Sequence, residues 1–316
     1  MERERLGLAT VPVGLAGWGV ADIQEIAREA EAAGFEAIFT TEVNNDAMAT
    51  AQLMGTATEK INVGTWIANV YLRHPYVCAQ GAAFIAALTG GRFILGLGVS
   101  HQPVNGALKI DMSNAAQEVR RYTTEVQAWL RGDGPATHLP QQPTSHKVPV
   151  YVAAVMSRMV EQAAELADGI MPIFWSPERV RRSKTWVERG RAKAPERGKC
   201  DITLGIPTFV GHDIEALRAA ARQNLVLYTY FPFFQHLFRA SGFTAEADQM
   251  ERGAGADSLS NELLDSICLI GPVERCKERL AEYREAGVDL PILMAPLGVE
   301  GARTVISAFS PAGVAA

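Results

Sequence analysis

The chain of 316 residues lacks the features of several common protein classes. No uninterrupted apolar run comes near the roughly 20 residues that a membrane-spanning helix needs. The N-terminal stretch MERERLGLATVPVG lacks the apolar segment of a signal peptide. The net charge is -5, so no overall positive field attracts nucleic acid or anionic lipid. These absences predict a cytoplasmic protein that binds neither nucleic acids nor membranes.

Cysteine is scarce, and its spacing is not that of the usual cysteine sites. Four cysteines lie far apart, with no C-x-x-C pair among them: Cys78, Cys200, Cys268 and Cys276. This spacing predicts reduced thiols in a cytoplasmic protein rather than disulfides. No group of histidines and carboxylates has the spacing of metal ligands either, so we expect no metal site.

What the chain does contain is a repeated order of amphipathic helix, glycine and short apolar strand. Apolar residues at helical spacing precede Gly34, and FEAIFTTE follows as a strand. The same order recurs around Asp168 and Gly169, and again before Gly287, where glycine suits a left-handed helix end. Its spread over the whole chain predicts one α/β domain covering residues 1–316.

Eight segments are candidate strands, most of them apolar on both faces. They are Leu6–Val11, Glu36–Thr41, Ile61–Ala68, Arg92–Leu97, Val148–Ala154, Gly169–Ile173, Ile202–Val210 and Leu290–Ala295. Helical patterns separate them, with Val119, Tyr122, Val126 and Trp129 as a clear example. Eight alternating strands and helices favour a (β/α)8 TIM barrel, and an open doubly wound sheet is the alternative.

Two segments interrupt this alternation. Gly132–Pro149 is polar and rich in proline, which predicts a surface loop. Residues 225–266 form an insertion that begins with LVLYTYFPFFQHLF. These aromatic residues either pack in the core or cap a ligand pocket, and the position of the insertion favours the cap.

The stretch TGGRFILGLGVSHQP, residues 89–103, is similar to two functional motifs and matches neither. Gly96 and Gly98 fit G-x-G-x-x-G, but His101 stands where the third glycine belongs. A nucleophile elbow, G-x-S-x-G, fails because Gln102 replaces its last glycine. What is left is a strand whose end places Ser100 and His101 at the C-terminal face of a barrel, where barrel enzymes do their chemistry.

The stretch GTWIANVYLRHPYVCAQGAAFIAALTGGRFILGLGVSH resembles the third and fourth β/α units of the luciferase-like flavin and deazaflavin oxidoreductases. Arg73–Pro75 and Gly91–Phe93 carry much of the match, and AREAEAAGFEAIFTTEVNND, VPVYVAAVMSRMVEQAAELADGIMP and IGPVERCKERLAEYREAGVDLPILMAP extend it. TTEVNN, LYTYFPFFQHLFRASGF and APLGVEGARTVISAF are most similar to the methylenetetrahydromethanopterin reductase branch. That branch uses coenzyme F420, a deazaflavin, and transfers hydride.

The resemblance implies three sets of cofactor-binding residues. A non-prolyl cis peptide within Thr65, Trp66 and Ile67, just after Gly64, would press against the back of the flavin ring. Asn69 either hydrogen-bonds the ring edge or makes a turn. The remaining expected contacts, to the ribityl and phosphate portion, are Gly98, Val99, Ser100, His101, Ala154, Val155, Met156 and Ser157. Small side chains, a hydroxyl and a helix N-terminus suit an anionic partner.

Glu42 and His101 are the candidate catalytic proton donors. Relatives often have Asp-His at the positions of Thr41 and Glu42, so Glu42 departs from that pattern. Asn44, Asn45 and Asp46 either contact ligand or cap a helix, with an asparagine as N-cap. The candidate substrate-binding residues are Asn44, Tyr228, Tyr230, Phe231 and Phe234, with Phe233 beside them in the roof of the pocket.

The resulting hypothesis is an F420-dependent oxidoreductase that transfers hydride to or from a C=N, C=C or C=O group or an alcohol. An FMN-dependent monooxygenase fed by a separate reductase is the first alternative, and a non-catalytic flavin-binding protein is the second. The basic run at Arg179, Arg181, Arg182 and Lys184 is typical of a solvated helix face, with an acidic cofactor tail as the other partner considered. Helices at Asp46–Thr58 and Pro75–Leu88 are rich in small and apolar residues on several faces, which predicts a homodimer.

Overall fold

A computed structural model describes residues 4–10, 16–133 and 145–310 of the chain. Most of the predicted surface loop at Gly132–Pro149 lies outside the described residues, because residues 134–144 are not among them. Within the described part, no helix is long and apolar enough to cross a membrane.

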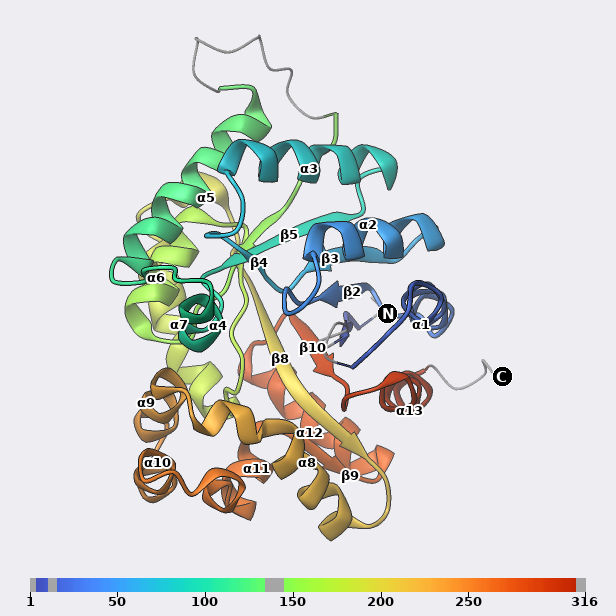
Figure 1. Cartoon of the computed structure of the whole chain (residues 1–316), viewed down its shortest axis with the longest axis vertical. Helices are drawn as coiled ribbons and strands as arrows, with labels where there is room; N and C mark the ends of the chain where they lie inside the picture. The colour runs from blue at the N-terminus through green and yellow to red at the C-terminus, as the bar shows by residue number, and fades with distance from the viewer. Residues whose placement is uncertain (1–3, 11–15, 134–144, 311–316) are drawn as a thin grey trace.

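Eight parallel strands close into a barrel, which confirms the predicted TIM-barrel architecture (Figure 1). They are β1 (Gly7–Thr10), β2 (Ala37–Thr40), β3 (Asn62–Thr65), β5 (Phe93–Gly98), β6 (Val150–Val152), β7 (Gly169–Ile170), β8 (Asp201–Val210) and β10 (Leu290–Met294). Strand β10 closes the barrel by pairing with β1, where Leu293 is opposite Leu8, and with β8, where Ile292 is opposite Gly205. The open-sheet alternative is therefore wrong.

Two short strands differ from the predicted set. The third predicted strand is interrupted after β3 at Trp66 and Ile67, and the chain resumes as β4 (Ala68–Asn69), which pairs with β5. Strand β9 (Leu269–Gly271) was not predicted, and it pairs with the last residues of β8 outside the barrel. It exists because β8 is ten residues long and continues past the barrel wall, which offers β9 a strand to pair with.

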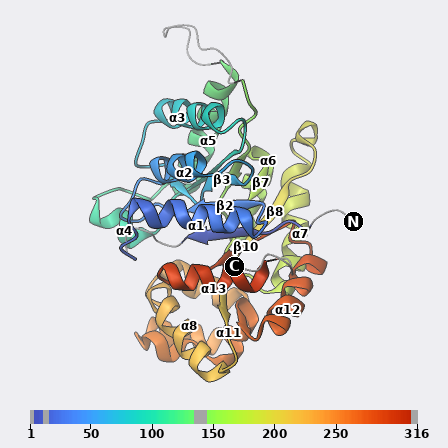
Figure 2. The ribbon, with the colours of Figure 1, turned by 90° about the vertical axis from the view of Figure 1, so that its right-hand side faces the viewer.

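Helices surround the barrel in the order that the sequence pattern predicts (Figures 1 and 2). They are α1 (Val20–Ala32), α2 (Ala47–Ala57), α3 (Pro75–Leu88), α4 (Gln102–Ala107), α5 (Ala115–Arg131), α6 (Ser157–Leu166), α7 (Pro177–Arg191), α12 (Val273–Ala286) and α13 (Val299–Phe309). Helix α5 buries Val119, Tyr122 and Val126 as its spacing predicts. Helix α12 ends at Gly287, whose φ of 114° is the left-handed conformation that glycine adopts most easily.

The predicted insertion is helical. It contains the end of α8 (Ile214–Thr229), then α9 (Pro232–Ala240), α10 (Thr244–Glu251), a 3-10 turn η2 (Gly255–Ser258) and α11 (Asn261–Ile267). We call the segment from the end of α8 to α11, residues 225–266, the insertion. It gathers at one end of the molecule, away from α3, as both views show (Figures 1 and 2).

A network of ion pairs and one hydrogen bond joins four strand regions at the N-terminal end of the barrel. Arg5 pairs with Glu36 and, at 3.0 Å, with Asp201. The Tyr151 hydroxyl donates to the same Asp201 carboxylate at 2.7 Å. These contacts link β1, β2, β6 and β8 at the face opposite the C-terminal strand ends. Residues at that face of a barrel usually stabilise the fold.

Candidate active site at the C-terminal strand ends

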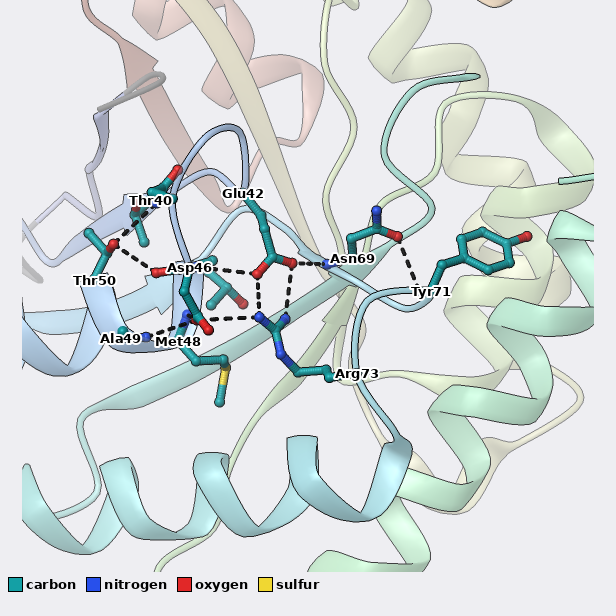
Figure 3. A network of polar contacts seen from close by, with 12 residues as sticks. Thr40, Glu42, Asp46, Met48, Ala49, Thr50, Asn69, Tyr71 and Arg73 are labelled. Carbon is teal, nitrogen blue, oxygen red and sulfur yellow. Dashed lines mark hydrogen bonds and ion pairs between the residues drawn. The ribbon is translucent and has the colours of Figure 1, made fainter. Parts of the chain in front are cut away.

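Glu42 lies at the centre of a polar network just after β2 (Figure 3). Its buried carboxylate pairs with both terminal nitrogens of Arg73, from the loop before α3. It also accepts from the Asn69 amide at 2.6 Å and from the Ala47 amide at 3.3 Å. Both oxygens are therefore engaged, a geometry that suits holding three segments together. The proton-donor role of Glu42 stays a prediction.

Asn69 belongs to the same region and is fully engaged as well. Its side-chain nitrogen donates to Asn105 Oδ1 at 2.8 Å, and its oxygen accepts from the Tyr71 amide. Asn105 in α4 is buried and donates in turn to the Val99 carbonyl at 2.7 Å. Asn69 thus makes a turn and ties it to α4, which favours the second of the two roles considered for it.

The loop after β2 corrects one capping prediction. Asp46, rather than an asparagine, is the N-cap of α2 and accepts from the Met48 and Ala49 amides. The Asn45 side chain instead binds inside the loop, donating to the Thr41 carbonyl at 2.9 Å and to Thr50. Asn44 is exposed with a φ of 56°, a conformation that asparagine tolerates better than most residues.

The segment after β3 has the backbone feature that the resemblance implies: the peptide bond between Trp66 and Ile67 is cis. The Trp66 indole lies against β8, where a Cβ on Gly205 would come within 2.2 Å of it. Thr65 is fully buried, and its hydroxyl donates to the Gly96 carbonyl at 2.7 Å. Gly64 has no room for a side chain, since a Cβ would lie 2.7 Å from the Ile94 oxygen. Gly64, Thr65 and the Trp66 ring therefore build the barrel wall.

Gly98 ends β5 at a crowded point of the barrel mouth. A Cβ there would lie 2.7 Å from Ile67 Cγ1 and 3.0 Å from Ala153 Cβ. The residue before β4 and the residue after β6 thus converge on the glycine that ends β5. Ser100 follows with a φ of 58°, and the chain then enters α4, a short helix where only a loop was predicted.

His101 lies beneath the insertion, in contact with its aromatic rings. The imidazole centroid is 5.1 Å from that of Phe231, 5.5 Å from Phe234 and 5.9 Å from Tyr228. Burial lowers the pKa of His101 to about 4 and raises that of Tyr228 to about 12, so both side chains are neutral near pH 7. The insertion therefore caps the barrel mouth.

Tyr230 does not belong to this ring cluster. Its side chain is 54% exposed, and its hydroxyl lies toward Gly255 in η2. The helical turn between α8 and α9 carries Tyr228 inward and Tyr230 outward, which corrects the prediction that both line the pocket. Phe233 is also largely exposed, although its ring touches Phe234 at 5.4 Å.

The N-terminus of α6 follows β6 with small or apolar residues and no side-chain cap. Its first intrahelical bond runs from the Val160 amide to the Met156 carbonyl, so the amides of the preceding turn point out of the helix. Ala154 and Val155 are buried, whereas Ser157 is half-buried. An uncapped helix N-terminus of this kind attracts anions.

Arg179 separates from the rest of the predicted basic run. Arg181 and Arg182 are exposed on α7, as a solvated face requires, but Arg179 is 3% exposed. Its guanidinium donates to the Val155 carbonyl at 3.3 Å, directly before α6. No local pattern in the sequence distinguishes Arg179 from its neighbours, because only the docking of α7 on the barrel turns position 179 inward.

Two clefts in the described residues lie elsewhere. One, of about 390 Å³, is lined by α11, β9 and α12, and the other, of about 400 Å³, by residues before β1, the turn after α1, α12 and the end of α13. Neither includes a predicted site residue. The candidate site is instead the capped mouth at the C-terminal strand ends, where barrel enzymes carry out their chemistry.

Comparison with known proteins identifies the family of the chain. The family model described as luciferase-like monooxygenase matches residues 8–290. The chain belongs to this family. A Mycobacterium tuberculosis protein whose name proposes a coenzyme F420-dependent oxidoreductase is 28% identical over 321 residues, covering 88% of this chain and 92% of that protein. A 5,10-methylenetetrahydromethanopterin reductase of Methanolobus tindarius is 24% identical, covering 88% and 91%.

The structure of a coenzyme F420-dependent tetrahydromethanopterin reductase from Methanopyrus kandleri superimposes with a TM-score of 0.79. It is 18% identical and covers 96% of this chain and 97% of its own. The likeness shows that the two share a fold. The chain is thus a member of an enzyme family that uses flavin or F420, as the resemblance implies.

The residues at the mouth fit such a cofactor. Ala153 and Ala154 have small side chains, and the α6 amides that follow them suit the phosphate of such a cofactor. The Thr41 hydroxyl, just after β2, is buried and has no hydrogen-bond partner among the residues that the structure describes, so the mouth offers a further polar atom. Three residues that hold this site together were not predicted to do so: Arg73, Asn105 and Gly205. Only the Arg73-His-Pro match in the sequence pointed to one of them.

Proposed function

We propose that the protein is a coenzyme F420-dependent oxidoreductase that transfers hydride between the deazaflavin and a small organic substrate. The substrate would carry a C=N, C=C or C=O group, or an alcohol. The observation that carries the proposal is the similarity, over about nine-tenths of both chains, to a relative whose name proposes a coenzyme F420-dependent oxidoreductase. The uncapped α6 N-terminus and the small residues beside it support a phosphate-bearing cofactor.

In this proposal the cofactor supplies the hydride chemistry, and the protein supplies orientation and exclusion of water. The backbone at Ile67, the Gly98–His101 turn and the Ala154–Ser157 segment would hold the cofactor. Tyr228, Phe231 and Phe234 would cover the substrate, with His101 facing it from the barrel rim. A neutral imidazole and a protonated phenol can each hydrogen-bond a substrate oxygen or nitrogen.

Titration of the protein with F420 and with FMN tests the proposal. Trp66 and Trp175 lie close to the proposed site, so their fluorescence should be quenched as the ring binds. We expect F420 to quench at micromolar concentrations and FMN to quench weakly. Failure to bind F420 would overturn the proposal.

Binding of FMN alone would favour the second candidate, a monooxygenase supplied with reduced flavin, for which the family description is the supporting observation. Binding of F420 with no turnover of any C=N, C=C, C=O or alcohol substrate would instead indicate a non-catalytic flavin-binding protein.

We also infer a cytoplasmic location, since all four cysteines are free and buried.

We propose further that the protein forms a homodimer through α2 and α3. Neither helix contains a charged residue. On α3, Val77, Phe84 and Leu88 are 56%, 58% and 46% exposed, and their spacing places them on one face. Such an apolar surface is typical of a protein interface.

A further inference from the structure

Arg179 is a buried cation without an ion-pair partner among the described residues. Its terminal nitrogens donate only to neutral acceptors: the Val155 carbonyl, the Ala240 carbonyl and the Ser241 hydroxyl. Its Nε has no hydrogen-bond partner in the described part of the chain either. The Trp186 ring, 5.2 Å away, provides a cation–π contact but no negative charge. Arg73, the comparable cation at the mouth, is balanced by Glu42.

The acceptors of Arg179 belong to two parts of the site. Val155 directly precedes the uncapped N-terminus of α6, and the Met156 sulfur is also within 3.3 Å of the guanidinium. Ala240 and Ser241 form the C-terminal end of α9. The N-terminal part of α9 carries Phe234, which packs on His101 over the mouth. Arg179 therefore connects the turn before α6, which attracts anions, to α9, which covers the mouth.

The positive charge of the Arg179 guanidinium is not balanced by an ion pair among the described residues. Burial and the nearby charge of Arg182 lower the pKa of Arg179 to about 10, so the guanidinium remains charged at neutral pH. An uncompensated buried charge is unfavourable, and an anion nearby relieves that cost. A phosphate on the α6 amides would be such an anion.

We propose that Arg179 is a positioning residue that couples the phosphate of a bound cofactor at the α6 N-terminus to the seating of α9 over the barrel mouth. The inference rests on the proposed function, in which the cofactor carries a phosphate. Occupation of the phosphate site strengthens the hold of Arg179 on α9, and a seated α9 in turn strengthens phosphate binding, because coupling between two sites is reciprocal.

The test compares F420 with its phosphate-free deazaflavin alcohol, by tryptophan quenching, in wild type and in Arg179→Met. Wild type should bind F420 more tightly than the phosphate-free alcohol. The ratio of the two affinities should be about tenfold smaller in Arg179→Met. Arg181→Met is the matched control, since it removes a charge from the exposed face of the same helix and should keep the preference. Arg179→Lys keeps the charge without the planar fork and should retain most of the preference.

Hydrogen exchange of the α9 amides supplies a readout that does not depend on turnover. F420 should protect α9 in wild type and in the control, and should fail to protect it in Arg179→Met. An equal loss of affinity for both cofactor forms, or unchanged protection of α9 in Arg179→Met, would overturn the coupling. Wild type that binds neither F420 nor FMN would overturn the proposed function itself, and is seen before any variant is made.

Discussion

Glu42 holds the loops around β2, β4 and α3 together through Arg73, Asn69 and Ala47. Glu42→Gln would leave the largely buried guanidinium of Arg73 with only the longer contact to Asp46, 3.3 Å. We expect a loss of about 3 kcal/mol in the free energy of unfolding, since one partner of a buried ion pair is removed. Denaturant unfolding measures it.

Asp46→Asn is the control for this change, because asparagine still caps α2 while the contact to Arg73 is weakened. It should cost less than Glu42→Gln. A Glu42→Gln protein of normal stability and cofactor affinity that has lost only kcat would instead show that Glu42 is the proton donor.

His101 makes stability depend on pH. Burial lowers its pKa to about 4, so between that pH and its ordinary value the unfolded chain binds a proton that the folded protein does not. Stability should therefore fall as the pH drops below about 6.5, by about 2–3 kcal/mol near pH 4. His101→Phe keeps a ring among the aromatic residues and removes the titration. The difference in the free energy of unfolding between wild type and His101→Phe should therefore change over this pH range. Parallel pH profiles of the two proteins would contradict the prediction.

At the scale of elements, the mouth depends on how closely β4, β5 and β6 end together. Gly98→Ala would place a Cβ 2.7 Å from Ile67 Cγ1 and force Ile67 or Ala153 to move. We expect a loss of about 1–3 kcal/mol in stability. Weaker cofactor binding should accompany it, because Ile67 is part of the proposed contact surface.

Gly106→Ala provides a comparison within α4, where a Cβ would meet nothing within 4 Å. Alanine in a helix is slightly favourable, so this variant should unfold and bind as wild type or better. Equal behaviour of the two glycine variants in thermal unfolding and in F420 titration would show that crowding at Gly98 does not matter.

The elements also show where local pattern stops being informative. Helices such as α5 and α12 were predicted because periodicity and a terminal glycine are local signals. Strand β9 was missed because its three residues pair only with the overhanging end of β8, about sixty positions earlier in the chain. The outward turn of Tyr230 was missed because the bend between α8 and α9 decides it.

For the whole molecule, the uncharged helices α2 and α3 predict association. Phe84→Glu would place a charge on the exposed apolar face of α3 and should convert a dimer to a monomer. Light scattering measures the mass in solution. Leu227→Glu on α8, a residue 54% exposed, is the control and should leave the dimer intact. A monomeric wild type would refute the homodimer.

The sequence by itself determined the barrel and the family, because both rest on local order: helix, glycine and buried strand recur along the chain. It also placed the candidate residues at the ends of strands, since parallel barrel strands all end at one face. Only the tertiary structure decided what those residues touch. Glu42 meets Arg73 31 positions away, and Arg179 meets Ser241 62 positions away. Such partners depend on how helices dock on the barrel, which no local pattern records.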